Sequence, residues 1–340
     1  MKQSDLIISA DPQVEDPFAG MDDSAEAVVE VEQRHLSIAP GQHGARLDRV
    51  LVEQVAEFSR SYLQQLIVAG AVQLKGAVVT KPSARVHVGE VLVIELRPTL
   101  QSQAFKPQPM ALDVVFEDEH LLVINKPAGL VVHPAPGNWS GTLLNGLLAR
   151  DPQAQFLPRA GIVHRLDKDT SGLMVVARTR SVMDALVRLI AARDVSRQYL
   201  ALAHGAWVGP RTQRAQWPIG RDPRNRLRMA AVDLAQHSGK AATTDIELLE
   251  NAAKGCWVRC TLHTGRTHQI RVHMMMLGHP LVGDTLYGGS AAAGLQRQAL
   301  HAFRLAFVHP VTGEAMEFRA GLPEDMSQAL RTWGLGYNGA

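Results

Sequence analysis

Apolar side chains recur three and four positions apart in the first patterned segment of the chain, as they do on the buried face of a helix. They predict one helix over 46–58 and a second that begins at Ser59 or Ser61 and stops at Gly70. Short apolar runs typical of strands follow, at 72–74, 78–79 and 91–96. The pattern therefore predicts a small module of two helices and a sheet over residues 34–98.

From residue 110 onward, short apolar runs outnumber helical patterns. Helices are predicted over 142–150 and 181–193, where apolar positions follow the helical period. The strand candidates lie at 114–116, 121–125, 173–177, 199–203, 243–249, 258–261, 303–308 and 315–318. Because strands and helices do not alternate strictly, the pattern predicts an α+β fold with a mixed, mostly antiparallel sheet rather than a doubly wound one.

Five segments are expected along the chain. Residues 1–33 hold many acids and little apolar pattern, which predicts a disordered tail, and the module at 34–98 follows it. The proline-containing stretch 99–109 has the composition of a linker. Residues 110–326 are expected to form a larger domain, and 327–340 a C-terminal tail.

The distribution of charge separates the tail from the rest of the chain. The net charge is +2, but residues 1–32 carry nine acids and one lysine, so the remainder is +10. A basic body suits a polyanionic partner such as RNA. An ordinary solubility charge is the alternative, and the charge alone does not decide between the two.

Cysteine content and hydropathy favour a cytoplasmic protein. The 2 cysteines, Cys256 and Cys260, fall in one strand candidate, and four strand residues span about 13 Å, too far for a disulfide. Lys2 and Asp5 stand where a signal peptide would need an apolar core. The longest stretch without charge, 128–149, contains prolines and glycines, so we expect no membrane span.

Motifs for common cofactors are not found in the expected settings. There is no GxxxxGK[ST], no HExxH and no CxxC, and no GxGxxG stands between a strand and a helix. His263, His268 and His273 are spaced by five, so they would not share one face of a helix. We expect no metal site and no redox cofactor.

The densest polar cluster is GIVHRLDKDTSG at 161–172, which stands before an apolar strand run. It brings His164, Arg165 and Asp167 into one loop, a common place for reactive side chains. A charged hairpin is the alternative, but a hairpin needs only a short turn.

Two more clusters are rich in arginine. The segment 264–273 leads into a helix that would place Arg271 beside its buried face. A buried arginine requires a carboxylate, and Asp167 and Asp169 are the candidates; a purely structural ion pair is the alternative. The third cluster has the composition of a phosphate-binding loop or of a solvated basic loop, and its arginines are Arg221, Arg224, Arg226 and Arg228.

The module at 34–98 resembles the S4 RNA-binding domain. The likeness rests on Arg46-Leu47-Asp48, Ser59-Arg60-Ser61, Val72-Gln73-Leu74-Lys75-Gly76 and Lys81-Pro82. It implies that the module binds RNA, and the basic side chains expected to contact it are Arg46, Arg60, Lys75 and Lys81. A small domain with an ordinary charged surface is the alternative.

The chain from about residue 40 to about residue 325 resembles the pseudouridine synthases of the ribosomal large-subunit family that carry an N-terminal S4 domain. GIVHRLDKDTSG is complete, and further blocks agree at 123–134, 197–201, 265–273 and 279–288. The resemblance implies the pseudouridine synthase fold and the isomerisation of specific uridines in large-subunit (23S) rRNA, with the helix 69 stem-loop as the expected target. The partner would be this rRNA or its precursor particle, and no cofactor is implied.

The resemblance also implies roles for four residues. The family's essential aspartate falls on Asp167, which would attack the ribose or remove its C2′ proton while uracil detaches and rejoins through C5. Arg271 matches the arginine that pairs with it and would keep the carboxylate ionised and in one rotamer. Tyr199 matches the aromatic residue that packs on the target base. Arg165 matches the residue that fills the gap left by the flipped nucleotide.

Two other functions remain open to the same sequence. A non-catalytic S4-type rRNA-binding or ribosome-assembly protein would need only the module at 34–98. A hydrolase would use Ser171, His164 and an aspartate, but no GxSxG elbow is present. All three implied catalytic residues are in place, which favours the synthase. A monomer is expected, since no self-complementary apolar stripe is evident.

Overall fold

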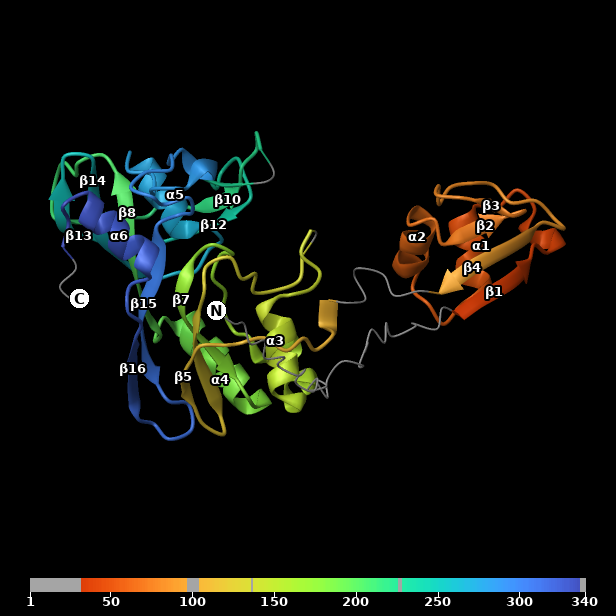
Figure 1. The fold of residues 1–340 in the computed structure, drawn as a ribbon, viewed down its shortest axis with the longest axis horizontal. Coiled ribbons are helices and arrows are strands. Elements are labelled where there is room, and N and C mark those ends of the chain that lie inside the picture. The colour runs from red at the N-terminus through yellow and green to blue at the C-terminus, as the bar shows by residue number, and fades with distance from the viewer. Residues whose placement is uncertain (1–31, 97–103, 136, 226–227, 337–340) are drawn as a thin grey trace, which may run out of the picture. The chain divides into compact units, whose positions relative to one another are not determined.

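The computed structural model describes residues 32–96, 104–135, 137–225 and 228–336 of the 340-residue chain. The chain divides into two compact units, Met1–Thr99 and Leu100–Ala340, here called the N-terminal and C-terminal units (Figure 1). Most of the expected acidic tail lies outside the described residues. Among the residues that the structure describes, no helix is long and apolar enough to cross a membrane.

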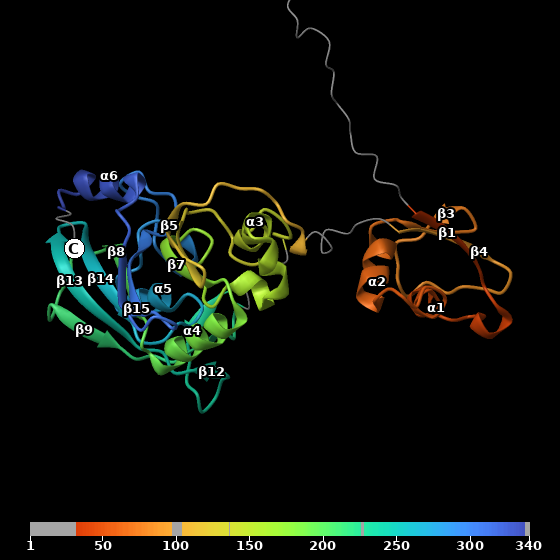
Figure 2. The ribbon, with the colours of Figure 1, turned by 90° about the horizontal axis from the view of Figure 1, so that it is seen from below.

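A four-stranded antiparallel sheet packs against two helices in the N-terminal unit (Figure 2). The strands, in the spatial order β1-β4-β2-β3, are β1 (Glu32–Ser37), β4 (Val91–Leu96), β2 (Val72–Leu74) and β3 (Ala77–Val78). The helices are α1 (Leu47–Gln54) and α2 (Arg60–Val68). One core joins helices and sheet and includes Leu51, Leu66 and Ile94, each fully buried.

The residues that end α2 on both sides, Ser59 and Gly70, are among those predicted from the sequence. The Ser59 hydroxyl accepts the N–H of Tyr62 and caps the first turn. At the other end Gly70 has a φ of 73°, and the N–H of Ala71 donates to the carbonyl of Leu66. This left-handed turn after the helix is the reason that glycine stands there.

Two details of the N-terminal unit differ from the sequence prediction. Helix α1 ends at Gln54 rather than at residue 58, because Val55 leaves the helical conformation with a φ of −127°. Strand β1 was not predicted, and it includes Glu32 and Gln33, which were assigned to the tail. Its sequence, EQRHLS, is mostly polar because the strand lies at the edge of the sheet and pairs only with β4.

A nine-stranded sheet organises the C-terminal unit (Figure 1). In spatial order it contains β5 (Val114–Glu117), β6 (Leu121–Lys126), β7 (Ser171–Ala177), β15 (Leu300–Val308), β8 (Ser196–His204), β14 (Gly255–Leu262), β13 (Thr244–Ala252) and β9 (Thr212–Ala215), with β16 (Ala315–Arg319) on β15. Among these pairs only β7 and β15 run parallel. The predicted α+β fold with a mixed, mostly antiparallel sheet is confirmed.

Helices cover both faces of this sheet. Helices α3 (Leu143–Arg150) and α5 (Gln269–Met276) pack on one face in a single large core. The opposite face has two separate cores, one under α4 (Arg180–Ala192) and one under α6 (Glu324–Thr332). A small sheet packs against the outer side of α5, and its strands are β10 (Ile219–Arg221), β11 (Met229–Ala231) and β12 (Gly239–Lys240).

The two ends of the C-terminal unit also differ from the prediction. The expected tail at 327–340 is helical as far as Thr332, because Met326, Ala329 and Leu330 form an apolar stripe that packs in the core of Trp257. The second half of the expected linker is bound to α3 rather than free: the side chain of Asn145 donates to the carbonyls of Ala104 and Lys106. Residues 97–103 and 337–340 lie outside the described part of the chain.

Candidate active site

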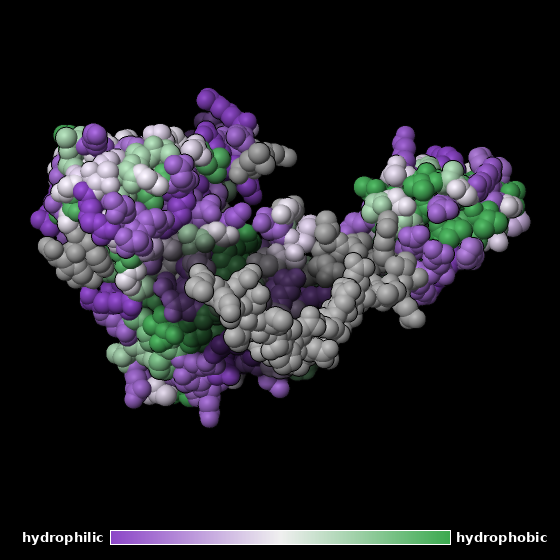
Figure 3. All heavy atoms as spheres, viewed as in Figure 1, coloured by the Kyte–Doolittle hydropathy of each residue, from purple (hydrophilic) through white to green (hydrophobic). Residues whose placement is uncertain are grey.

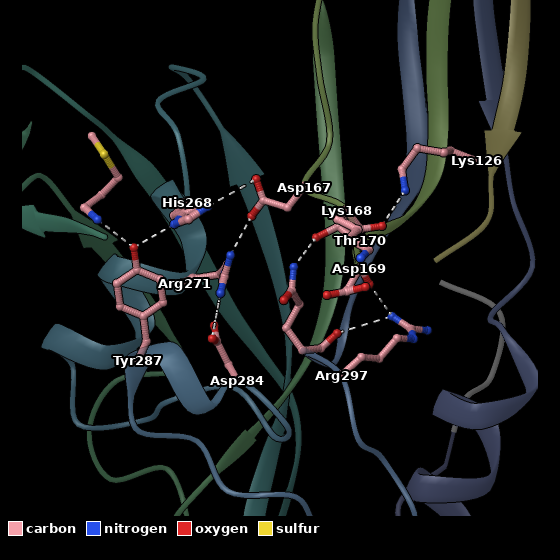
Figure 4. A network of polar contacts seen from close by, with 12 residues as sticks. Lys126, Asp167, Lys168, Asp169, Thr170, His268, Arg271, Asp284, Tyr287 and Arg297 are labelled. Carbon is pink, nitrogen blue, oxygen red and sulfur yellow. Dashed lines mark hydrogen bonds and ion pairs between the residues drawn. The ribbon is translucent and has the colours of Figure 1, made fainter. Parts of the chain in front are cut away.

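The loop from 162 to 170, which leads into β7, is held at several points along its backbone (Figure 4). The buried ammonium of Lys126 donates to three carbonyl oxygens, including that of Lys168 at 2.9 Å. Burial lowers the pKa of Lys126 to about 8, although Asp169 and Asp167 oppose the shift. On the other side Arg297 donates to the carbonyl of Asp169 at 3.0 Å. These contacts fix the backbone that carries Asp167.

Asp167 points toward Arg271 of α5, which pairs with two carboxylates (Figure 4). The Nη1 atom of Arg271 donates to Asp167 at 3.0 Å, while Nε and Nη2 form a two-pronged contact with Asp284 at 2.7 and 2.8 Å. Burial lowers the pKa of Arg271, but the contacts with Asp284 and Asp167 outweigh it and leave that pKa above its usual value. The predicted pair is confirmed, whereas Asp169 is not the partner.

Asp284 was missed as a site residue although it stands in a block that matched the family. Its side chain is 1% exposed, so it holds Arg271 from behind while Asp167, at 16%, reaches the cleft. The charge of Arg271 is therefore shared between a buried acid, Asp284, and one that lines the cleft, Asp167. Two signals in the sequence could have pointed to Asp284: the matching block at 279–288 and the need of a buried arginine for carboxylates.

A second chain of contacts reaches the other oxygen of Asp167 (Figure 4). The N–H of Met229 donates to the Tyr287 hydroxyl, which lies 2.7 Å from Nδ1 of His268. Nε2 of His268 lies 3.9 Å from Asp167, and burial lowers the pKa of His268. His268 and Tyr287 were not predicted as site residues, because the contact joins segments distant in the sequence.

Tyr199 and Arg197 lie two positions apart in β8, so both side chains are on the same face of the sheet. Tyr199 is 6% exposed and lines the same cleft as Asp167. Burial raises the pKa of Tyr199 to about 12, so its phenol is neutral near pH 7. A neutral aromatic ring in this place suits packing against a base, as the resemblance implies for Tyr199.

The residues required for a serine hydrolase are not brought together. Ser171 is buried at the start of β7 and lies 2.9 Å from Nδ1 of His301. His164 instead accepts the backbone N–H of Val175 through Nε2. Burial, helped by Arg197, lowers the pKa of His164 to about 3, so it is neutral. The hydrolase reading is therefore wrong.

Asp167 and Tyr199 line a cleft of ≈ 640 Å³ that is rich in positive charge. Among the residues that the structure describes, its lining includes six arginines and one acid, Asp167; the arginines are Arg159, Arg165, Arg193, Arg197, Arg266 and Arg271. Arg165 is exposed, as a residue that enters RNA would be. In the described residues no group of three or more His, Cys, Asp or Glu side chains is placed to hold a metal ion. The arginines of the cleft can therefore bind a polyanion, and Asp167 can contact one group of that polyanion.

In the N-terminal unit most of the predicted RNA contacts are also ion-pair partners. Arg46 and Arg60 donate to the fully buried Asp48, and Lys75 pairs with Glu90 at 2.7 Å. These three side chains remain about half or more exposed, and Lys81 is exposed as well. The visible surface of the unit mixes hydrophilic and apolar residues (Figure 3).

The arginine-rich loop after β10 is shaped by one acid. Asp222 accepts the N–H of Arg224 and pairs with Arg228 at 2.6 Å, so Arg228 is half-buried and part of the loop. Arg221 and Arg224 are exposed, whereas Arg226 lies outside the described residues.

Comparisons with known proteins agree with this architecture. Residues 120–275 match the family model of the RNA pseudouridylate synthases, and residues 45–92 match the S4 domain. A ribosomal large subunit pseudouridine synthase D of Neisseria meningitidis serogroup B (strain ATCC BAA-335 / MC58) is 48% identical over 298 residues, which cover 84% of this chain and 78% of that protein. The chain belongs to the RNA pseudouridine synthase family.

A second relative covers slightly more of the chain, and a solved structure shares its fold. The enzyme of the same name from Xylella fastidiosa (strain Temecula1 / ATCC 700964) is 48% identical over 310 residues, or 87% of this chain and 91% of that protein. The human RNA pseudouridylate synthase domain containing 4 shares the fold, with a TM-score of 0.52, 23% identity and coverage of 66% of this chain and 94% of that one. The predicted family, fold and enzyme class are confirmed, and the non-catalytic alternative is not favoured.

Proposed function

We propose that this synthase isomerises uridines of large-subunit (23S) rRNA, and that the helix 69 stem-loop is its target. The relatives with which it shares almost half of its residues are named for the ribosomal large subunit. The observation that carries the chemistry is the pair of Asp167 and Arg271 in a cleft whose other charged lining residues are arginines. Such a cleft attracts phosphates and presents a single carboxylate to a ribose.

Asp167 is the catalytic residue of this proposal. A carboxylate can either add to C1′ of the ribose or remove the C2′ proton, and both routes release uracil for reattachment through C5. Either route requires the carboxylate to be held in one orientation. Arg271 provides this from one side, and Asp284 fixes Arg271 in turn.

Tyr199 and Arg165 act on the flipped nucleotide. A target uridine must leave its stack before C1′ and C5 become accessible to a side chain. The neutral ring of Tyr199 would pack against the uracil in the cleft. The exposed Arg165 would occupy the space that the nucleotide vacates.

The two units divide the work in this proposal. The S4-like module at residues 34–98 of the N-terminal unit binds rRNA or its precursor particle through Arg46, Arg60, Lys75 and Lys81. The arginine-rich segment that starts at the end of β10 adds contacts from Arg221, Arg224, Arg226 and Arg228. The domain at residues 110–326 of the C-terminal unit carries the chemistry. We expect a monomer in the cytoplasm, where ribosomal precursors occur, and light scattering of the purified chain tests the monomer.

Mapping of pseudouridine in 23S rRNA tests the proposal. Cells without this protein should lack pseudouridine at positions in helix 69, and the wild-type gene should restore it. The Asp167→Asn variant should be produced at the same level and restore none. If helix 69 is unchanged while other positions lose the mark, the target is wrong. If no position changes, the large-subunit substrate is wrong.

A further inference from the structure

Arg197 is a buried cation without an acid. Arg197 lies in β8 and is 6% exposed. Its Nε has no hydrogen-bond partner among the described residues. Within that part of the chain it also forms no ion pair with a carboxylate closer than 4 Å. The other deeply buried arginine of the cleft, Arg271, has two acids. Burying an unpaired charge destabilises a fold, so an arginine in this state requires another reason to be there.

The guanidinium of Arg197 lies at the wall of the catalytic cleft rather than in the interior of the sheet. It lines the cleft together with Asp167 and Tyr199. Arg197 and Tyr199 lie two positions apart on one face of β8, so the guanidinium stands on the same wall of the cleft as the Tyr199 ring. A Cβ at Gly265 would come within 2.9 Å of Nη1 of Arg197, so the lack of a side chain at residue 265 leaves room for the guanidinium in this position.

The other arginines of the cleft are placed differently. Arg159, Arg165 and Arg193 are exposed, and Arg266 donates to the carbonyl of Ala241. Exposed arginines attract RNA over a distance and can adopt many positions. Arg197 is fixed in a strand, so it can recognise one anion in one place.

We propose that Arg197 binds a backbone phosphate next to the target uridine and thereby sets the depth at which the ribose meets Asp167. This inference rests on the proposed function, since it requires an RNA substrate. The ribose that Asp167 must reach has a phosphate on each side, and a guanidinium binds phosphate through two parallel hydrogen bonds. The buried cation is paired only when the nucleotide is in the cleft.

A cycle of protein and RNA changes tests the contact directly. The full-length protein and its Arg197→Met variant are compared on a helix 69 stem-loop RNA in which one phosphate flanking the target uridine is replaced by an uncharged methylphosphonate. For the wild type, the modification at one of the two flanks should lower RNA affinity and single-turnover rate by about 10–100-fold. With unmodified RNA, Arg197→Met should show the same loss of affinity and rate relative to the wild type. Replacing that phosphate in the RNA should then cause no further loss in the variant.

Thermal unfolding of the free protein separates binding from a structural role. Methionine has a similar length and no charge, so Arg197→Met should melt at the same temperature as the wild type or higher. Arg331→Met, in α6 and away from the cleft lining, is the matched control and should change neither affinity nor rate. The Arg197→Met variant should also lower the slope of log affinity against log salt by about 0.7.

The outcomes distinguish this inference from the proposed function. Suppose that the wild type modifies helix 69, but that each methylphosphonate lowers the affinity of Arg197→Met as much as it lowers that of the wild type. The two changes are then independent, and Arg197 does not bind either flanking phosphate. If Arg197→Met melts at a much lower temperature, the residue is structural and the inference is wrong. If the wild type leaves helix 69 unmodified, the target of the proposed function fails, and the affinity cycle, which needs no turnover, still decides the contact.

Discussion

In the N-terminal unit Arg46 and Arg60 both bond to the buried Asp48, whereas in the cleft of the C-terminal unit Arg197 is buried without an acid. The pKa of Asp48 lies well below its usual range, chiefly because of its bonds to Arg46, with burial opposing and Arg60 adding to the shift. Arginine thus stabilises the fold in one unit, whereas in the other we infer that it binds a phosphate of the substrate. Counting arginines in a sequence does not distinguish the two uses.

Asp167→Asn should produce the largest effect, because it removes the one carboxylate that the cationic cleft contains. The variant keeps the size of the side chain and loses the anion. We expect isomerisation to fall by about 10⁴-fold or more in single-turnover experiments, as for other groups that act on the reacting atoms. RNA affinity should stay the same or rise slightly, since a negative charge near phosphates is gone.

Asp169→Asn is the matched control for this prediction. Asp169 contributes its backbone carbonyl to Arg297 and lies two residues from Asp167 in the same loop. We expect its isomerisation rate to stay within about 10-fold of the wild type, because the loop backbone keeps its contacts. Substantial turnover by Asp167→Asn, or equal losses for both variants, would contradict the assignment of the catalytic carboxylate.

Arg271→Lys should have the next largest effect, although it preserves the charge. Arg271 uses one nitrogen for Asp167 and two for Asp284, and an ammonium cannot hold both acids in this geometry. A displacement of the reactive carboxylate by about 1 Å is expected to reduce the rate about 100-fold. Asp284→Asn should lower the rate in the same direction while leaving KM nearly unchanged. Wild-type turnover in Arg271→Lys would show that the arginine does not orient Asp167.

The contact between Asp167 and Arg271 could be predicted from the family motifs that contain both residues, and not from their spacing in the sequence. Asp167 and Arg271 are separated by 104 positions, and no local period connects them. Asp284 was not assigned, since the division of one guanidinium between two acids depends on how α5 packs. His268 and Tyr287 were missed for the same reason: their contact to Met229 joins β11 to a distant loop.

Helices and strands could be predicted where the apolar positions of the sequence are also the buried positions of the structure. Strand β4 has the predicted bounds, because its alternate side chains face the core. Strand β1 lacks that pattern because it is an exposed edge. Helix α6 was read as a tail although its apolar stripe was present, and only its packing with Phe303 shows that the stripe is buried. A local pattern therefore indicates an element, whereas its partner depends on the rest of the chain.

Asp48→Asn should destabilise the N-terminal unit alone. Asp48 accepts bonds from Arg46, Arg60 and Gln64, and an amide cannot balance two guanidinium groups. We expect a loss of about 2 kcal/mol in the stability of this unit. Hydrogen exchange of full-length protein measures it, and peptides from the C-terminal unit should exchange as in the wild type. Glu53→Gln, in an exposed pair with Arg49, is the control and should change stability by less than about 0.5 kcal/mol.

The cationic cleft should make stability depend on pH below neutrality. Burial lowers the pKa of His133 to about 4 and of His164 to about 3, and neighbouring arginines add to both shifts. The unfolded chain binds protons at these histidines below about pH 6.5, whereas the folded chain does not. Stability should therefore be complete above pH 6.5 and fall as the pH drops toward 4. Denaturant unfolding at pH 7 and 4.5 measures how much the free energy of unfolding falls between the two pH values. For His164→Gln this fall should be smaller by about 2 kcal/mol than for the wild type. An unchanged loss would contradict the neutral state of His164.

The smallest expected effect separates two lysines of the N-terminal unit. Lys75 is paired with the buried Glu90 at 2.7 Å, whereas Lys81 is exposed, so Lys81 should contribute more to RNA binding. Lys81→Met should weaken affinity about 3-fold at moderate salt and lower the salt slope by about 0.7 to 0.9, as for the loss of one phosphate contact. Lys75→Met should change affinity less and instead reduce stability by up to about 1 kcal/mol. Salt titrations of both variants, read beside their unfolding curves, make the measurement. A larger effect of Lys75→Met on the salt slope would show that ion-paired cations of the N-terminal unit also bind RNA. The difference between these cations and the unpaired arginine of the cleft would then be smaller than the structure indicates.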